Sequence, residues 1–242
     1  MQIKKILLLL IFSSAIQCFA QTNFTYTPEK PKAGDVISIT YSHAGDIANA
    51  KSPITATVSI LGSKGQNAND LDLKKSGNSY SATVKTDTSD NFVFFSFSAD
   101  KNFDNNFNNG YWIQLYDGDK IKSGSDISLS QFYQFGGRSA GVDVNNDKAL
   151  QYMEQEFSSY PETKKPMLLS YVRIYSIVKK DDGPAMIQKE IESTLKDGLK
   201  DETDYSNLKG LYTLAKLPQQ SAFITTLMKE KFPNGKWKAG ET

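Results

Sequence analysis

Hydrophobic and polar positions alternate one for one between Asn23 and about Tyr116. Because side chains alternate between the two faces of a strand, each alternating run predicts a strand with one face in a core. Turn sequences such as Gly62-Ser63-Lys64-Gly65 separate the runs. Short strands at this spacing predict an immunoglobulin-like β-sandwich over residues 21–120. The runs lie at residues 24–27, 37–41, 56–60, 80–84 and 111–115, with a denser aromatic run at 92–97.

From about Asp147 the hydrophobic period changes to 3.6, which predicts helices. The expected helices begin near residues 147, 166, 184, 204 and 218. Hydrophobic residues recur at an offset of 37, and small alanines at 149, 185 and 222 follow nearly the same period. This repeat predicts stacked tetratricopeptide-like hairpins over residues 146–235, with chance periodicity in an ordinary bundle as the alternative.

The predicted fold class is therefore an all-β immunoglobulin-like sandwich followed by an all-α tetratricopeptide-like helical-hairpin segment. Residues 121–145 are expected to form the linker between the two domains, with a short strand or helix at 127–135. The aromatic side chains of Phe132, Tyr133 and Phe135 are expected to cover the junction.

The first 20 residues have the layout of a cleavable signal peptide. Lys4 and Lys5 form a positive start, an apolar run follows, and Ala20 ends a cleavage sequence before Gln21. The apolar run is too short to span a bilayer. We expect a periplasmic or secreted protein with no membrane span; lipid attachment at Cys18 is the alternative.

The charge and cysteine content exclude several classes of protein. The chain has 28 basic and 27 acidic residues; removing Lys4 and Lys5 with the signal peptide leaves 26 basic residues. A chain so close to neutral has no electrostatic reason to bind nucleic acid. Cys18 is the only cysteine, so the exported part has none for a disulfide.

Several segments resemble one family of exported proteins. The opening strand block Phe24–Asp35, the stretch Asn109–Asp117 and the segment Asp147–Phe157 carry the similarity, together with the closing segment Lys229–Gly235. They resemble the N-terminal half of thioredoxin-like disulfide reductases, in which an immunoglobulin-like domain and a helical segment precede a thioredoxin domain. The resemblance implies an accessory role beside that domain.

The chain departs from this family in its chemistry. Thiol–disulfide exchange needs a Cys-x-x-Cys pair, in which one thiolate attacks and its neighbour resolves. This sequence has no such pair, so no catalytic residue is carried over. The resemblance leaves two interpretations, namely part of a longer reductase or a separate protein that keeps only the accessory half.

Metal and catalytic motifs are incomplete. Two Asp-x-Asn-x-Asp sequences, 100–104 and 143–147, match the first ligand positions of a calcium loop. Both lack the glycine at position six, so a polar turn and a helix cap are the favoured interpretations. His43 is the only histidine and has no partner in a motif. We therefore predict no catalytic residue, no metal ligand and no cofactor.

Three hypotheses for function remain from the sequence. The first is a non-catalytic exported scaffold or protein-interaction module of the cell envelope, with another envelope protein as partner. The second is the accessory half of a thioredoxin-like oxidoreductase. The third is a glycan-binding module, which would use an aromatic platform of Tyr111, Trp112, Tyr116, Phe132, Tyr133 and Phe135. The oligomeric state stays open.

Overall fold

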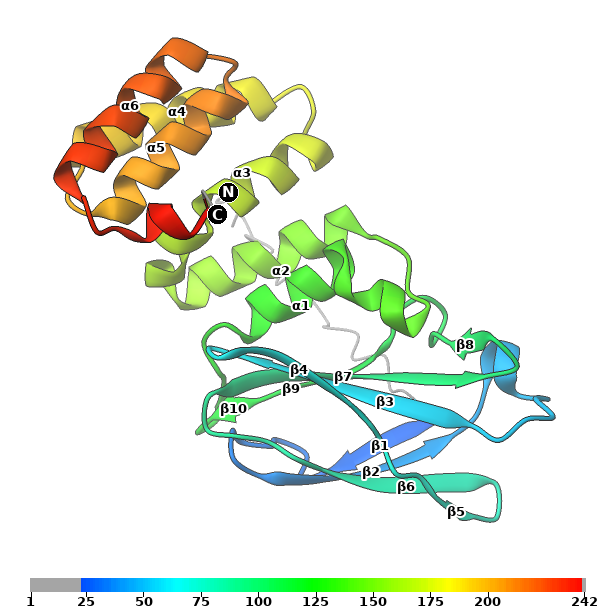
Figure 1. The fold of residues 1–242 in the computed structure, drawn as a ribbon. Helices are drawn as coiled ribbons and strands as arrows, with labels where there is room; N and C mark the ends of the chain where they lie inside the picture. The colour runs from blue at the N-terminus through cyan, green and yellow to red at the C-terminus, as the bar shows by residue number, and fades with distance from the viewer. Residues whose placement is uncertain (1–22, 241–242) are drawn as a thin grey trace, which may run out of the picture.

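The computed structural model describes residues 23–240. The predicted signal peptide at 1–20, its cleavage position and Cys18 lie outside the described residues. Within them, antiparallel strands occupy the first part of the chain and helices the second, and the helices stack above the sheets (Figure 1).

Two antiparallel sheets lie face to face in the strand region. One has the order β1-β2-β6-β5, and the other has the order β4-β3-β7-β8 with β9 also paired to β7. A small ribbon of β10 (Tyr116–Asp117) and β11 (Lys120–Ile121) follows. The first sheet contains β1 (Phe24–Thr27), β2 (Val36–Ser42), β5 (Lys74–Ser76) and β6 (Ser79–Lys85). The second contains β3 (Thr55–Gly62), β4 (Gly65–Asp70), β7 (Asp90–Ala99), β8 (Asn102–Asp104) and β9 (Tyr111–Gln114).

Strand β7 is buried on both of its faces, which explains its dense aromatic sequence. Phe95 and Phe97 point into the core between the two sheets. Phe92 and Phe94 point the other way, into a second core formed with the helices. One strand therefore joins the two cores.

Helix α1 (Ser125–Gln134) covers the outer face of the β7 sheet, and α2 (Asn146–Ser159) packs on α1 (Figure 1). Leu129 and Phe132 of α1 pack in one core with Phe92 and Phe94. The predicted all-β sandwich followed by an all-α segment is therefore wrong. The described chain is a mixed structure of antiparallel sheets and helices, because the outer face of the sheet is apolar and must be covered.

The segment expected to be a linker, 121–145, holds helix α1 and the 3-10 helix η2 (Gly136–Ala140). Phe132 and Tyr133 are buried there, as expected for residues that cover the junction. Phe135 is 59% exposed and lies outside the core that Phe132 and Tyr133 join, so it does not cover the junction as expected.

The remaining helices extend away from the sheets (Figure 1) and lie within a few residues of the predicted ranges. They are α3 (Lys164–Val178), α4 (Gly183–Asp197), α5 (Glu202–Leu214) and α6 (Pro218–Lys231). Of the alanines in the sequence repeat, Ala149 is buried, but Ala185 and Ala222 are exposed. The close approach between helices instead uses Gly210, where an added Cβ would lie 2.5 Å from Leu169 of α3.

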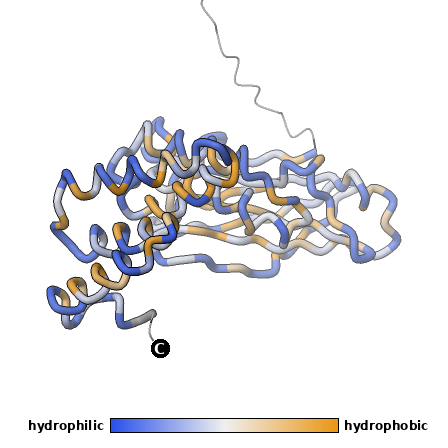
Figure 2. The backbone as a smooth tube through the Cα atoms, turned by 90° about the horizontal axis from the view of Figure 1, so that it is seen from above, coloured by the Kyte–Doolittle hydropathy of each residue, from blue (hydrophilic) through white to orange (hydrophobic). Residues whose placement is uncertain are grey.

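Hydrophobic positions are interrupted by hydrophilic ones along the helices (Figure 2). None of the helices in residues 23–240 has the length and apolar character needed to cross a bilayer.

Candidate functional site

Strand β4 forms one edge of its sheet, and its outer side has no neighbouring strand in the described structure. All six of its residues are exposed. It pairs with β3 from Gly62↔Gly65 to Thr57↔Asp70, and the ladder continues one residue further, where the Leu71 N–H donates to the Ala56 carbonyl across 2.9 Å.

The register of this ladder decides which backbone groups of β4 point outward. In an antiparallel pair, residues that exchange hydrogen bonds with the partner strand alternate with residues that do not. Leu71 bonds to Ala56, so Gly65, Asn67 and Asn69 are the other residues turned toward β3. Gln66, Ala68 and Asp70 therefore present their N–H and C=O groups to the open side.

The two edge strands of the other sheet carry features that hinder pairing with another chain. Lysines, prolines and short length are common means of blocking an edge. Edge strand β5 carries Lys74 and Lys75, and edge strand β1 runs into Pro28. Strand β4 has no proline or lysine and a single charge, on Asp70. Of these three edge strands, β4 is the most open to strand addition.

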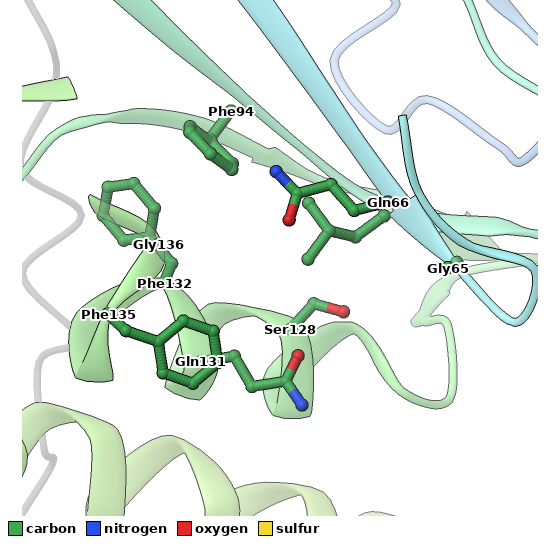
Figure 3. Close-up of a pocket in the computed structure, with 10 residues that line it drawn as sticks. Gly65, Gln66, Phe94, Ser128, Gln131, Phe132, Phe135 and Gly136 are labelled. Carbon is green, nitrogen blue, oxygen red and sulfur yellow. The ribbon is translucent and has the colours of Figure 1, made fainter. Parts of the chain in front are cut away.

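A groove lies beside this edge, between the β3–β4 hairpin and α1 (Figure 3). Its volume is about 170 Å³. The side chain of Gln66 reaches from the strand toward Phe94, across the groove from the helix that carries Ser128 and Gln131 (Figure 3). The apolar part of the lining consists of Leu61, Phe94, Phe132 and Phe135.

The groove continues into a more open, polar hollow of about 400 Å³. Gly62, Ser128 and Gln131 line both parts. Lys122 lines the hollow, but its Nζ donates to the Asp90 carbonyl across 2.8 Å and to the Thr88 carbonyl. The Lys122 ammonium group is therefore already hydrogen-bonded to backbone carbonyl groups.

Two buried carboxyl groups lie at the start of α1. Glu156 is fully buried, and its Oε1 accepts from the Gly124 N–H across 2.6 Å. Asp126 accepts from the Gln114 amide across 2.7 Å. Burial raises the pKa of Glu156, and the nearby Asp126 charge raises it further. Burial also raises the pKa of Asp126. Glu156 thus caps a helix, and it is not among the residues that line the groove.

The residues of the two calcium-like sequences serve the fold. Asp104 is buried and accepts from the Tyr41 hydroxyl across 2.7 Å and from the Ala44 N–H across 3.0 Å. Asp100 accepts from the Lys51 N–H. Asn145 is the N-cap of α2, one position before the expected cap at Asn146 or Asp147. No group of three or more potential metal-ligating His, Cys, Asp or Glu side chains occurs among the described residues.

His43 lies edge-on to the Tyr80 ring, with centroids 6.0 Å apart. Its Nδ1 is buried and has no hydrogen-bond partner among residues 23–240. No catalytic pair forms around it in that part of the chain.

The aromatic residues considered for a sugar platform do not form one surface. Tyr111 is buried between the sheets, and Phe132 and Tyr133 are buried under the helices. Tyr116 lies beneath Lys30 at the β10–β11 ribbon. Phe135 alone of these residues is strongly exposed, and it lines the groove.

The sequence does not predict β4, because an exposed polar strand carries no hydrophobic alternation. The sequence Gly65-Gln66-Asn67-Ala68-Asn69-Asp70 reads as a loop. The signal that could have found it is the two-residue turn Ser63-Lys64 between glycines, directly after a strongly alternating strand, because such turns close hairpins.

Comparison of the chain with protein-family models finds no match, and comparison with curated proteins finds no significant match.

Proposed function

We propose that this protein is a non-catalytic interaction module of the cell envelope that binds an extended protein segment along strand β4. The envelope compartment rests on the signal peptide expected at residues 1–20. The observation that carries the binding role is the open edge of β4, with the outward backbone groups of Gln66, Ala68 and Asp70.

Strand addition supplies affinity through main-chain hydrogen bonds, and nearby side chains supply specificity. The β4 edge can supply the main-chain hydrogen bonds, because three of its residues offer both a donor and an acceptor. The groove can supply the specificity. Gln66 and Gln131 line it from opposite sides, and the strand that carries Gln66 is the edge strand itself.

The buried carboxyl groups also favour binding over catalysis. A general acid or base must reach a substrate. Glu156 is fully buried, where it accepts hydrogen bonds from Gly124 and Ser123. Its shifted pKa therefore follows from a structural position.

Ala68→Pro tests the proposal, because proline removes the one N–H that points outward at this position. The ladder to β3 uses the neighbouring residues, so the fold is retained. A photoreactive amino acid at Gln66 should cross-link a protein segment in the native envelope, and Ala68→Pro should abolish that cross-link. Slower hydrogen exchange of the Gln66 and Ala68 amides in the complex identifies strand addition.

Lys75→Pro is the matched control. Lys75 lies opposite Tyr80, next to the turn that closes at Ser76↔Ser79, so its N–H also points outward, from the edge of the other sheet. The Lys75→Pro variant should leave the cross-link at Gln66 intact. A cross-link that persists in Ala68→Pro, or that Lys75→Pro removes equally, contradicts the proposal.

A further inference from the structure

We propose that the segment that adds to β4 is strand β4 of a second copy of this chain, so that the two sheets join into one across a two-fold axis at Ala68. This inference rests on the proposed function and names its partner. It comes from the sequence of the strand taken together with its register.

The centre of the strand, Asn67-Ala68-Asn69, is symmetric about Ala68. The ladder with β3 runs from Gly65 to Leu71, and Ala68 is its midpoint. Ala68 also points its backbone groups outward. Two antiparallel copies centred on Ala68 therefore pair outward-pointing residues with outward-pointing residues over the whole ladder. A two-fold axis makes each contact occur twice.

On the helix side of the sheet, this register sets Gln66 opposite Asp70 of the second copy. Gln66 and Asp70 share this face because they lie opposite Leu61 and Thr57 on β3. An amide N–H₂ donates to a carboxylate, so the pair is complementary. The two Asp70 side chains lie four residues apart, roughly 13 Å along the strands, so like charges do not meet.

On the other face, Asn67 lies opposite Asn69 of the second copy. These two form the pair that exchanges no backbone hydrogen bonds, where Cα atoms approach to about 4.5 Å and side chains are closest. Each amide carries both a donor and an acceptor, so the two can bond to each other. The polar sequence that makes β4 resemble a loop thus makes it complementary to itself.

Charge complementarity continues beyond the strand. Lys64, in the turn before β4, comes opposite Asp72 of the second copy, and the symmetry gives two such pairs. Lys64 is 75% exposed in its present contact with Asp87, at 3.5 Å. Exposed ion pairs contribute little stability, but opposite charges at both ends favour this register over a shifted one.

A cysteine at the two-fold axis tests the pairing directly. Cys18 is the only cysteine in the sequence, so the background variant Cys18→Ser leaves an introduced cysteine alone. In a bonded antiparallel pair the two Ala68 Cα atoms are about 5.5 Å apart. This separation lies within the range of about 4.4–6.8 Å that a disulfide spans. Ala68→Cys should therefore oxidise to a covalent dimer, whereas Lys75→Cys should stay reduced.

Two further cysteine variants test the register. Asn67→Cys and Asn69→Cys should each cross-link poorly alone, because each residue is offset from its own copy. A mixture of the two should give the mixed dimer. Equal cross-linking of all combinations would show random collision and overturn the inference.

Sedimentation of the unmodified protein provides a second readout. The wild-type chain and Lys75→Pro should sediment with the mass of two chains, and Ala68→Pro with the mass of one. A wild-type monomer whose Ala68→Cys variant also stays reduced overturns the inference. If Gln66 then still cross-links a different protein in the envelope, the proposed function stands without self-pairing; if it cross-links nothing, both fail.

Discussion

Glu156 of α2 accepts a hydrogen bond from the Gly124 N–H across 2.6 Å and so caps α1, a helix whose own N-cap residue has no side chain. Helix N-termini leave N–H groups without partners inside the helix. A carboxylate is favourable at that position, but burial of its charge is costly. The two effects oppose each other at one residue.

This opposition makes stability depend on pH. Burial raises the pKa of Glu156 in the folded chain. Its contribution to stability is therefore complete below the ordinary pKa of glutamate and is lost as the pH rises through the raised value. The Glu156→Gln variant keeps an acceptor for Gly124 and removes the buried charge. Its free energy of unfolding, measured in urea titrations, should fall less than that of the wild type as the pH rises above the ordinary pKa of glutamate.

Glu230→Gln is the control for this prediction, because Glu230 is exposed on α6. It should leave the pH dependence unchanged. Glu156→Ala should lose about 1–3 kcal/mol, because it leaves the Gly124 N–H unpaired. A pH profile of Glu156→Gln that matches the wild type would contradict the assignment.

The core shared by the sheets and helices predicts a single unfolding transition. Leu129→Ala removes a fully buried side chain from that core and should cost about 2–5 kcal/mol. With Trp237→Phe, Trp112 of β9 is the remaining tryptophan and reports on the sheet. The fluorescence of Trp112 and the helical circular dichroism should change at the same urea concentration, both with and without the Leu129→Ala substitution. Separate midpoints would mean that the sheets and helices unfold independently.

Gly110 is required by a close contact as well as by its backbone angle. Its φ is +76°, and an added Cβ would overlap the tip of the Phe132 ring. Gly77 has φ +60° with open space around it. Each alanine variant should lose about 1–2 kcal/mol from left-handed strain, and Gly110→Ala about 1–3 kcal/mol more from overpacking. Equal losses of unfolding free energy for Gly110→Ala and Gly77→Ala, measured by thermal unfolding, would exclude the Phe132 contact as a cause.

Glu202 holds the C-terminal segment against α5. Its carboxylate accepts from the Trp237 N–H across 2.6 Å and from the Lys236 N–H across 2.9 Å. Glu202→Ala should release this segment and speed tryptic cleavage after Lys236 and Lys238, while the midpoint of global unfolding changes little. Glu192→Ala, at an exposed position of α4, should leave the cleavage rate unchanged.

Local pattern predicted most individual elements but not how they combine. The alternation at 37–41 and 80–84 corresponds to β2 and β6, and the 3.6 period from residue 147 corresponds to α2 through α6. Each of these elements buries one face, which leaves a periodic trace in the sequence. The dense apolar run at Phe92–Phe97 indicated that both faces of this strand are covered. The sequence of one strand does not show which element covers the second face.

The site was the least predictable part. Strand β4 buries no side chain, so its sequence carries neither period, and the groove exists only where the hairpin meets α1. The function of Glu156 was equally hidden, because its partner Gly124 lies 32 residues away in the chain.

The sequence by itself determined the period of each element, the turns between them, the near-neutral charge and the absence of a Cys-x-x-Cys pair, because these depend only on residue identity and local spacing. The tertiary structure alone decided that α1 and α2 share a core with β7, and that β4 lies at an open edge. Both are long-range choices made by apolar faces that must be covered and by backbone groups that need partners. The symmetry of Asn67-Ala68-Asn69 belongs to the sequence, but it bears on pairing only because the fold leaves the outer edge of that strand open.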